Sequence, residues 1–186
     1  MKKQIKDIAS IRTGLFAKPS GQGEVLYLQA KHFDEQGQLL SELYPDLAAE
    51  GIAEKHRLQA GDVLFAAKGT KNFATVFEDH NEAAVASTSF FVVRLTDKKL
   101  LPAYLAWFLN SPATQTVLKG QAIGSSIPSI SKQVLENLEI TAPGIEIQKA
   151  ILQIAQLRTR EKALKLGIET LREKQIQQQI NNAIKY

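Results

Sequence analysis

The sequence predicts an α+β fold: a globular domain with a mixed, irregular β-sheet and short helices over residues 1–143, followed by a long C-terminal helix of the coiled-coil type over residues 144–186. Two observations predict this division. Residues 1–143 alternate short apolar runs with glycine, proline and serine, which is typical of strands joined by turns. Residues 144–186 contain no proline and have leucines at seven-residue spacing, as expected for a helix that packs on another helix.

Four apolar runs in the globular part predict strands. They are residues 25–28, 63–67, 73–77 and 84–95. Gly61 and Asp62 form a turn before the second run, and the polar residues 68–72 separate it from the third, which can follow as its partner strand. The fourth run includes two phenylalanines and two valines at 90–93, so we expect it to be a central strand.

A helix is predicted to begin at Pro102, where the missing proline N–H is harmless. Bulky apolar residues recur at helical spacing as far as Leu118, and Gly120 is a plausible stop. Ser131 is predicted to cap a further short helix. Residues 138–140 then form a last short strand before the long helix.

Charge is distributed unevenly between the two parts. Lys and Arg number 23 and Asp and Glu number 19; residues 1–143 hold 15 of each, so the whole excess of four lies in residues 144–186. A neutral domain binds nucleic acid only if its basic residues gather on one face. The chain has no cysteine, which excludes disulfides and thiolate metal sites and fits a cytoplasmic location. No membrane span or signal peptide is expected.

Catalytic patterns are weak. The three histidines lie far apart, so no metal site is expected. Gly21 and Gly23 do not follow a strand, and Lys68-Gly69-Thr70 lacks the order of a phosphate-binding loop, so no cofactor is expected either. An alternative hypothesis is a small metal-dependent nuclease that uses Asp79, Asp97 and Lys99. The same residues are more typical of a charged turn after the strand at 90–95, and we favour that interpretation.

Binding patterns are better defined. The loop at 68–72 carries Lys68, Thr70, Lys71 and Asn72 beside a glycine. Lysine and backbone N–H groups contact phosphates, and asparagine can pair with adenine. A solvated hairpin turn has the same composition, and the residues alone leave both interpretations open. Further candidate donors are Arg12, Lys18, Lys31, Ser125 and Ser126.

The long helix carries a partial heptad pattern. Leu157, Leu164 and Leu171 are seven residues apart, and Ile154 and Ile168 occupy the companion position, which Glu161 interrupts. Forty helical residues span about 60 Å, about twice the diameter of a small domain. Part of the helix must therefore project, and we expect it to self-associate. Two alternatives remain. One is a fully solvated helix, and the other is a module that recruits another protein and binds no DNA.

Four segments, in this order, resemble the specificity subunit of type I restriction–modification enzymes. Residues 5–14 are similar to its opening "I-x-x-G" turn, and residues 58–65 to its "L-x-x-G-D-I-L" element. Residues 102–111 resemble its "P-x-Y-L-x-x-x-L-x-S" helix, and residues 127–140 its "I-x-x-I-S … L-x-x-L-x-I" segment. One departure is that the family's Pro-Pro and Glu-Gln pairs are replaced by Ala142-Pro143 and by Glu146-Ile147-Gln148.

The resemblance implies a non-catalytic subunit that recognises double-stranded DNA through a target-recognition domain. It also implies that the long helix acts as a spacer and docks DNA methyltransferase subunits, with the endonuclease subunit as a further partner. A usual family member carries two recognition domains and two helices, whereas this chain has one of each. The implied unit is a homodimer with antiparallel helices that reads an inverted repeat, one half-site per chain.

Overall fold

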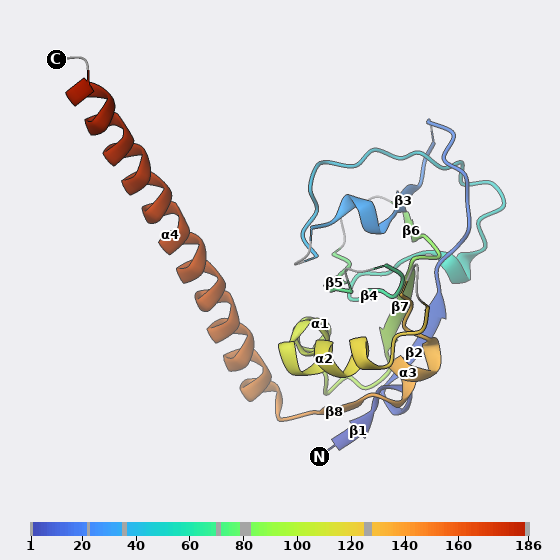
Figure 1. Ribbon diagram of the computed structural model, residues 1–186. Coiled ribbons are helices and arrows are strands. Elements are labelled where there is room, and N and C mark those ends of the chain that lie inside the picture. The colour runs from blue at the N-terminus through green and yellow to red at the C-terminus, as the bar shows by residue number, and fades with distance from the viewer. Residues whose placement is uncertain are drawn as a thin grey trace. The chain divides into compact units, whose positions relative to one another are not determined.

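The computed structural model describes residues 2–21, 23–34, 37–69, 72–78, 83–124 and 128–184. The chain forms two compact units, Met1–Gln148 and Lys149–Tyr186. The first unit mixes short strands with short helices, and the second is a continuous helix (Figure 1). The predicted α+β class with a long C-terminal helix is confirmed.

A four-stranded antiparallel sheet organises the first unit, in the order β2-β7-β4-β5. Its strands are β2 (Ala9–Thr13), β7 (Phe90–Leu95), β4 (Val63–Ala66) and β5 (Ala74–Val76). Val93 of β7 lies opposite Ile11 on one side and Val63 on the other. The expectation of a central strand at 90–93 is therefore confirmed, and β5 partners β4 as predicted.

Two further strand pairs lie in the described part of the chain. β1 (Lys2–Gln4) is antiparallel to β8 (Glu139–Thr141), and β3 (Leu26–Leu28) is parallel to β6 (Ala84–Ala86). The β1–β8 pair joins the start of the chain to the segment that leads into the long helix. Three single-turn 3-10 helices lie between strands: η1 (Ile5–Asp7), η2 (Ala30–His32) and η3 (Glu54–His56).

The helix expected from Pro102 to Gly120 is in fact two helices, α1 (Pro102–Asn110) and α2 (Pro112–Gly120). The prediction of one helix was wrong because a residue before proline is disfavoured in the helical region. Ser111 is extended, with φ −64° and ψ 142°, and its Oγ accepts a hydrogen bond from the Thr114 N–H at 3.4 Å. It thus ends α1 and caps α2.

The predicted cap at Ser131 is confirmed. α3 (Lys132–Asn137) begins after it, and the Ser131 Oγ accepts from the Val134 N–H at 3.2 Å. This bond satisfies one of the N–H groups that the first turn of a helix leaves without a partner.

One hydrophobic cluster lies against one face of the four-stranded sheet. Phe33, Phe73 and Phe90 pack there with ring centroids 5.6 to 5.9 Å apart. Leu26 and Leu28 of β3 belong to the same buried cluster. The core therefore joins the β3–β6 pair and the sheet in one unit.

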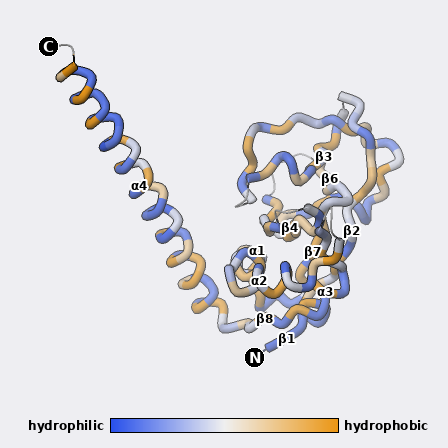
Figure 2. Tube along the Cα trace, in the orientation of Figure 1, coloured by the Kyte–Doolittle hydropathy of each residue, from blue (hydrophilic) through white to orange (hydrophobic). Residues whose placement is uncertain are grey.

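The long helix is α4 (Ile145–Ile184). Ile154, Leu157, Leu164, Ile168 and Leu171 are 51–66% exposed in the single chain, and Figure 2 shows apolar and polar residues alternating along the helix. Its polar residues keep it from being a membrane span, and none of the other helices in the described part of the chain is long and apolar enough to be one.

Candidate nucleic-acid interface

The first candidate loop closes the hairpin between β4 and β5. Lys68 follows β4 and is exposed, and Gly69 has φ 102°, which favours glycine. The Asn72 amide Nδ2 donates to the Ala66 carbonyl at 2.9 Å, so this side chain helps to close the hairpin. Thr70 and Lys71 lie outside the described residues.

The second candidate loop meets the first. The Gly69 N–H donates to the Pro128 carbonyl at 2.9 Å, and Lys68 forms an antiparallel bridge with Ser129. Ser129 also exchanges two backbone hydrogen bonds with Ile123, at 2.9 and 3.0 Å. Ser125 and Ser126 lie outside the described residues, but the residues on either side of them are held beside the β4–β5 hairpin.

We call this region the two-loop surface. It consists of Lys68, Gly69, Asn72, Ile123, Gly124 and Ser129. Lys68 offers an exposed cation, and glycines at two positions leave the backbone accessible to a ligand that approaches closely. Ile123 is 71% exposed, and an apolar side chain beside polar donors can contact a thymine methyl group. The combination suits contact with phosphates and base edges.

Arg12 lies on the face of β2 that carries an ion-pair network around Asp62. The Asp62 carboxylate is 1% exposed and accepts two hydrogen bonds from Arg94, both 2.7 Å, and one from Arg12 Nη2 at 3.2 Å. Both guanidinium groups also donate to the Arg57 carbonyl, at 3.0 and 3.3 Å. The network therefore joins the segment at Arg57 to the sheet.

The network shifts the pKa values of Arg12 and Arg94 in opposite directions. Burial lowers the pKa of Arg12, the charge of Arg94 lowers it further, and Asp62 opposes both. Hydrogen bonding to Asp62 raises the pKa of Arg94. A half-buried Arg12 with internal partners has a structural role, so its substitution would not test DNA contact cleanly.

Lys18 and Lys31 are exposed elsewhere on the first unit. Lys31 lies in η2 beside His32, whose pKa is lowered first by burial and then by the charge of Lys31, with Asp46 opposing. Within the described ranges, no hydrogen bond or ion pair joins Arg12, Lys18 or Lys31 to the two-loop surface.

Asp97, the carboxylate of the nuclease hypothesis, has structural partners. It accepts from Lys3 Nζ at 2.6 Å and from the Lys99 N–H at 2.9 Å, and these two bonds lower its pKa. Asp97 thus attaches β1 to the turn after β7. Asp79 lies outside the described residues, and the part of the chain that is described contains no group of three or more His, Cys, Asp or Glu that could hold a metal.

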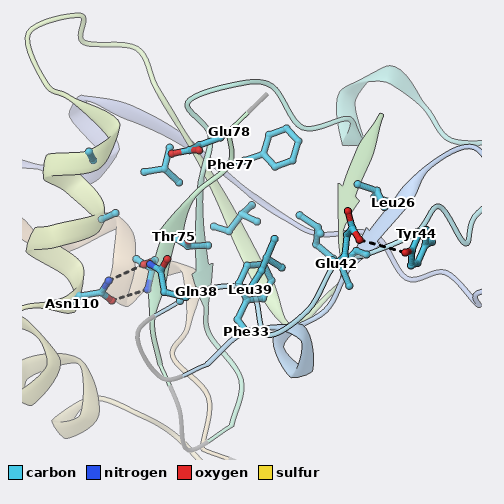
Figure 3. A pocket seen from close by; sticks show the side chains of 18 residues that line it. Leu26, Phe33, Gln38, Leu39, Glu42, Tyr44, Thr75, Phe77, Glu78 and Asn110 are labelled. Atoms are coloured by element: carbon cyan, nitrogen blue, oxygen red, sulfur yellow. Dashed lines mark hydrogen bonds between the residues drawn. The ribbon is translucent and has the colours of Figure 1, made fainter. Parts of the chain in front are cut away.

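A cavity of about 820 Å³ lies between α1, β5 and the segment at 37–44 (Figure 3). Phe33, Leu39 and Tyr44 line it, together with the carboxylates of Glu42 and Glu78. None of the described residues that line it is lysine or arginine. Its charge does not suit a phosphate backbone, so we do not include it in the candidate interface.

Sequence reasoning missed three residues that shape the first unit: Asp62, Asn110 and Gln148. Asp62 was predicted as part of a turn, and Asn110 as part of a longer helix. The two bonds between the Asn110 amide and the Ala74 backbone, both 2.7 Å, cover the outer edge of β5 (Figure 3). Gln148 is fully buried although it was noted only as a departure from a motif. A buried polar residue cannot be distinguished from an exposed one by local pattern.

Comparison with known proteins points to one family. Residues 1–182 match the family model described as "Type I restriction modification DNA specificity domain". No curated protein sequence matches the chain. Similar solved structures include the type I restriction-modification system S subunit from M. genitalium (15% identity, TM-score 0.57, covering 84% of this chain and 38% of that one).

Two further structures are similar. The HsdS subunit from Thermoanaerobacter tengcongensis has 19% identity and a TM-score of 0.61, with 89% of this chain and 39% of that one covered. A structure of the type I R-M system, reported for its complex assembly and conformational transition, has 18% identity and a TM-score of 0.63, with 89% and 40% covered. At these identities the likeness shows the fold, and the chain spans about two fifths of each relative.

Proposed function

Because the chain belongs to the family of type I restriction–modification DNA specificity domains, we propose that it recognises one half of a bipartite DNA sequence and catalyses no reaction itself. The observation that carries this proposal is the two-loop surface. Residues from two distant loops, both of the composition expected for DNA contact, are held together by the bond from Gly69 to Pro128. Lys68 and the neighbouring Lys71 would contact phosphates, and Asn72, Ser125 and Ser126 would lie near base edges.

The proposed working unit is a homodimer. Ile154, Leu157, Leu164, Ile168 and Leu171 of α4 are all more than half exposed in the single chain, and exposed apolar stripes mark surfaces that bind a partner. Two chains related by a twofold axis would present two recognition domains to an inverted repeat. We propose that the paired helices also dock methyltransferase subunits, and that the endonuclease subunit joins the assembly.

The charge balance limits the affinity that one domain can supply. Residues 1–143 carry equal numbers of acidic and basic groups, and phosphate neutralisation dominates the affinity of proteins for DNA. We therefore expect modest affinity from the chain alone and a larger contribution from methyltransferase subunits.

The test uses duplexes enriched from a random pool by the purified chain, with and without the methyltransferase subunit. An inverted repeat with a fixed spacer should emerge. On that duplex, Lys68→Ala with Lys71→Ala should reduce the slope of log K against log salt by roughly 4, because each lysine neutralises about one phosphate and the dimer loses two lysines from each chain. Lys55→Ala with Lys98→Ala changes the net charge equally and should leave the slope unchanged.

Two results would contradict the proposal at different levels. If no sequence is enriched even with the methyltransferase subunit, DNA recognition fails. If a repeat is enriched but both lysine pairs have the same slope as the parent chain, recognition stands and the two-loop surface is not the interface.

A further inference from the structure

Phe16, in the segment after β2, is exposed although the residues on both sides of it are packed. Its side chain is 73% exposed, whereas Leu15 and Ala17 are partly buried against a hydrophobic cluster that includes Tyr27. A single exposed apolar residue is common on protein surfaces. Phe16 differs from such residues in how firmly its backbone is held and in where it lies.

Hydrogen bonds hold the backbone on either side of Phe16. The Tyr27 hydroxyl donates to the Leu15 carbonyl at 3.0 Å and accepts from the Ala17 N–H at 3.3 Å. The Leu15 N–H donates to the Ala86 carbonyl at 2.7 Å. Tyr27 is buried, so these bonds belong to the folded core. The ring of Phe16 is therefore presented to solvent from a stretch of chain whose position is set by the fold.

Gly14 lets this stretch lie against the turn that precedes β7. A Cβ at Gly14 would overlap the Ser87 carbonyl oxygen, and the next residue along the chain forms a parallel bridge with Ser87. The Phe90 N–H donates to the Ser87 carbonyl at 3.0 Å, which closes the turn 87–90. The stretch and the turn are thus neighbours, about 5 Å apart as adjacent strands are.

The same turn connects this stretch to the two-loop surface. The Ser89 carbonyl accepts from the Ala67 N–H at 2.9 Å, and the Ala67 carbonyl accepts from the Ile130 N–H at 2.9 Å. Lys68 of the two-loop surface follows Ala67 directly. Phe16 therefore lies at one end of a row of neighbouring segments. Two strand spacings, or about 10 Å, separate its segment from the one that carries Lys68.

We propose that Phe16 inserts between two base pairs of the bound DNA as an apolar wedge and thereby determines part of the sequence preference. This inference rests on the proposed recognition of DNA through the two-loop surface. In proteins that bind the minor groove, an exposed phenylalanine can partly unstack one base step and kink the duplex. A separation of about 10 Å equals about three base-pair steps, so Phe16 and Lys68 can reach the same half-site.

A wedge selects sequence through the cost of deforming the DNA. Pyrimidine–purine steps, TA and CA/TG, are the easiest to kink. We therefore expect one such step at a constant distance from the bases that the two-loop surface contacts. Phe16 carries no charge, so it contributes to affinity without changing the number of phosphates that are neutralised. These two properties distinguish a wedge from the lysine contacts.

Enrichment of duplexes from a random pool by the parent chain and by Phe16→Ala, each with the methyltransferase subunit, tests the proposal. Both should select the same bases except at one step of each half-site, where only the parent selects pyrimidine–purine. On the parent's duplex, Phe16→Ala should bind at least roughly tenfold more weakly, because an aromatic contact with a base is lost. Its slope of log K against log salt should equal that of the parent.

The bend of the duplex gives a second measurement. Energy transfer between dyes at the two ends of the selected duplex should be higher with the parent than with Phe16→Ala, because a wedge brings the ends together. Phe16→Leu keeps an apolar wedge and should retain the bend and the step preference. Leu40→Ala removes an apolar side chain that is 64% exposed outside this row, and it should match the parent in every measurement.

The outcomes separate the wedge from the proposed function. Equal sites, affinities and bends for the parent and Phe16→Ala overturn the wedge and leave DNA recognition standing. Loss of methyltransferase binding by Phe16→Ala without DNA means that a partner subunit covers the ring, which also overturns the wedge. If the parent enriches no sequence, both proposals fail. If Phe16→Ala melts below the parent, Phe16→Gln, which also lacks an apolar wedge, replaces it in each measurement.

Discussion

At the scale of single residues, several side chains bind backbone groups that neither a strand nor a helix pairs. Asn110 satisfies both outward groups of Ala74, and His32 Nδ1 accepts from the Gln29 N–H at 3.3 Å. Buried or half-buried backbone groups need such partners, because leaving them without a hydrogen bond costs about 1–3 kcal/mol each. These residues therefore help to determine the shape of the loops in which they lie.

His32 gives the first unit a dependence on pH. Burial and Lys31 lower the pKa of its imidazole from the ordinary 6.5, and the neutral ring is the form that accepts from Gln29. Between the lowered pKa and 6.5 the unfolded chain binds more protons than the folded one. The contribution of His32 to stability is thus complete above pH 6.5 and is lost as the pH falls below it.

We expect the melting temperature to fall more between pH 7.5 and pH 5.5 in the parent chain than in His32→Gln. His56 and His80 are present in both proteins, so the difference between the two curves isolates His32. Melting followed by circular dichroism at the two pH values measures it, and equal decreases would show that His32 does not couple folding to protonation.

At the scale of elements, the start of α4 depends on one buried side chain. Gln148 Oε1 accepts from the Leu101 N–H at 2.9 Å, and its Nε2 donates to the carbonyls of Lys99 and Pro143, both at 2.8 Å. These bonds attach the first turn of the helix to the segment before α1 and to the end of the β8 segment. A helix with mostly exposed residues gains no comparable support from packing.

Gln148→Ala should lower the free energy of unfolding of the first unit by about 2–3 kcal/mol, because it leaves three backbone groups without their partner. Gln153→Ala, at an exposed position of the same helix, should change it by less than about 0.5 kcal/mol. Urea unfolding of both variants measures the difference. Similar values for the two would mean that water replaces the Gln148 amide at little cost.

At the scale of the whole molecule, folding and assembly use different surfaces. The core of the first unit is built from residues of its strands and short helices, whereas the apolar residues along α4 are exposed in the single chain. Replacing the exposed apolar residues of α4 with charged ones should therefore abolish pairing of the two helices without unfolding the first unit.

Leu157, Leu164 and Leu171 changed together to Asp should give monomers in sedimentation, because six carboxylates would enter the seam of each dimer. The melting temperature of the first unit should stay unchanged, and binding to an inverted repeat should become as weak as binding to a single half-site. Glu169→Gln with Glu173→Gln, outside the stripe, is the control. A triple variant that stays dimeric would show that the helices do not pair through this face.

Much of this organisation could be predicted from local sequence. The apolar runs, Ser131 as a cap and the long helix are properties of neighbouring residues, which periodicity and capping chemistry report directly. The error at Ser111 had a local cause as well, since the Ser-Pro pair is visible in the sequence and outweighs the helical spacing around it.

The sequence by itself thus determined the class of fold, the length of α4, its apolar stripe and, through four ordered motifs, the family. Only the tertiary structure decided which loops meet at Gly69 and Pro128, that Asp62 gathers two arginines, and that Gln148 is buried. The physical reason is the separation along the chain of the residues that interact. Secondary structure follows from contacts within a few residues, whereas these features depend on burial and hydrogen bonds between segments far apart in the chain, which carry no periodic pattern.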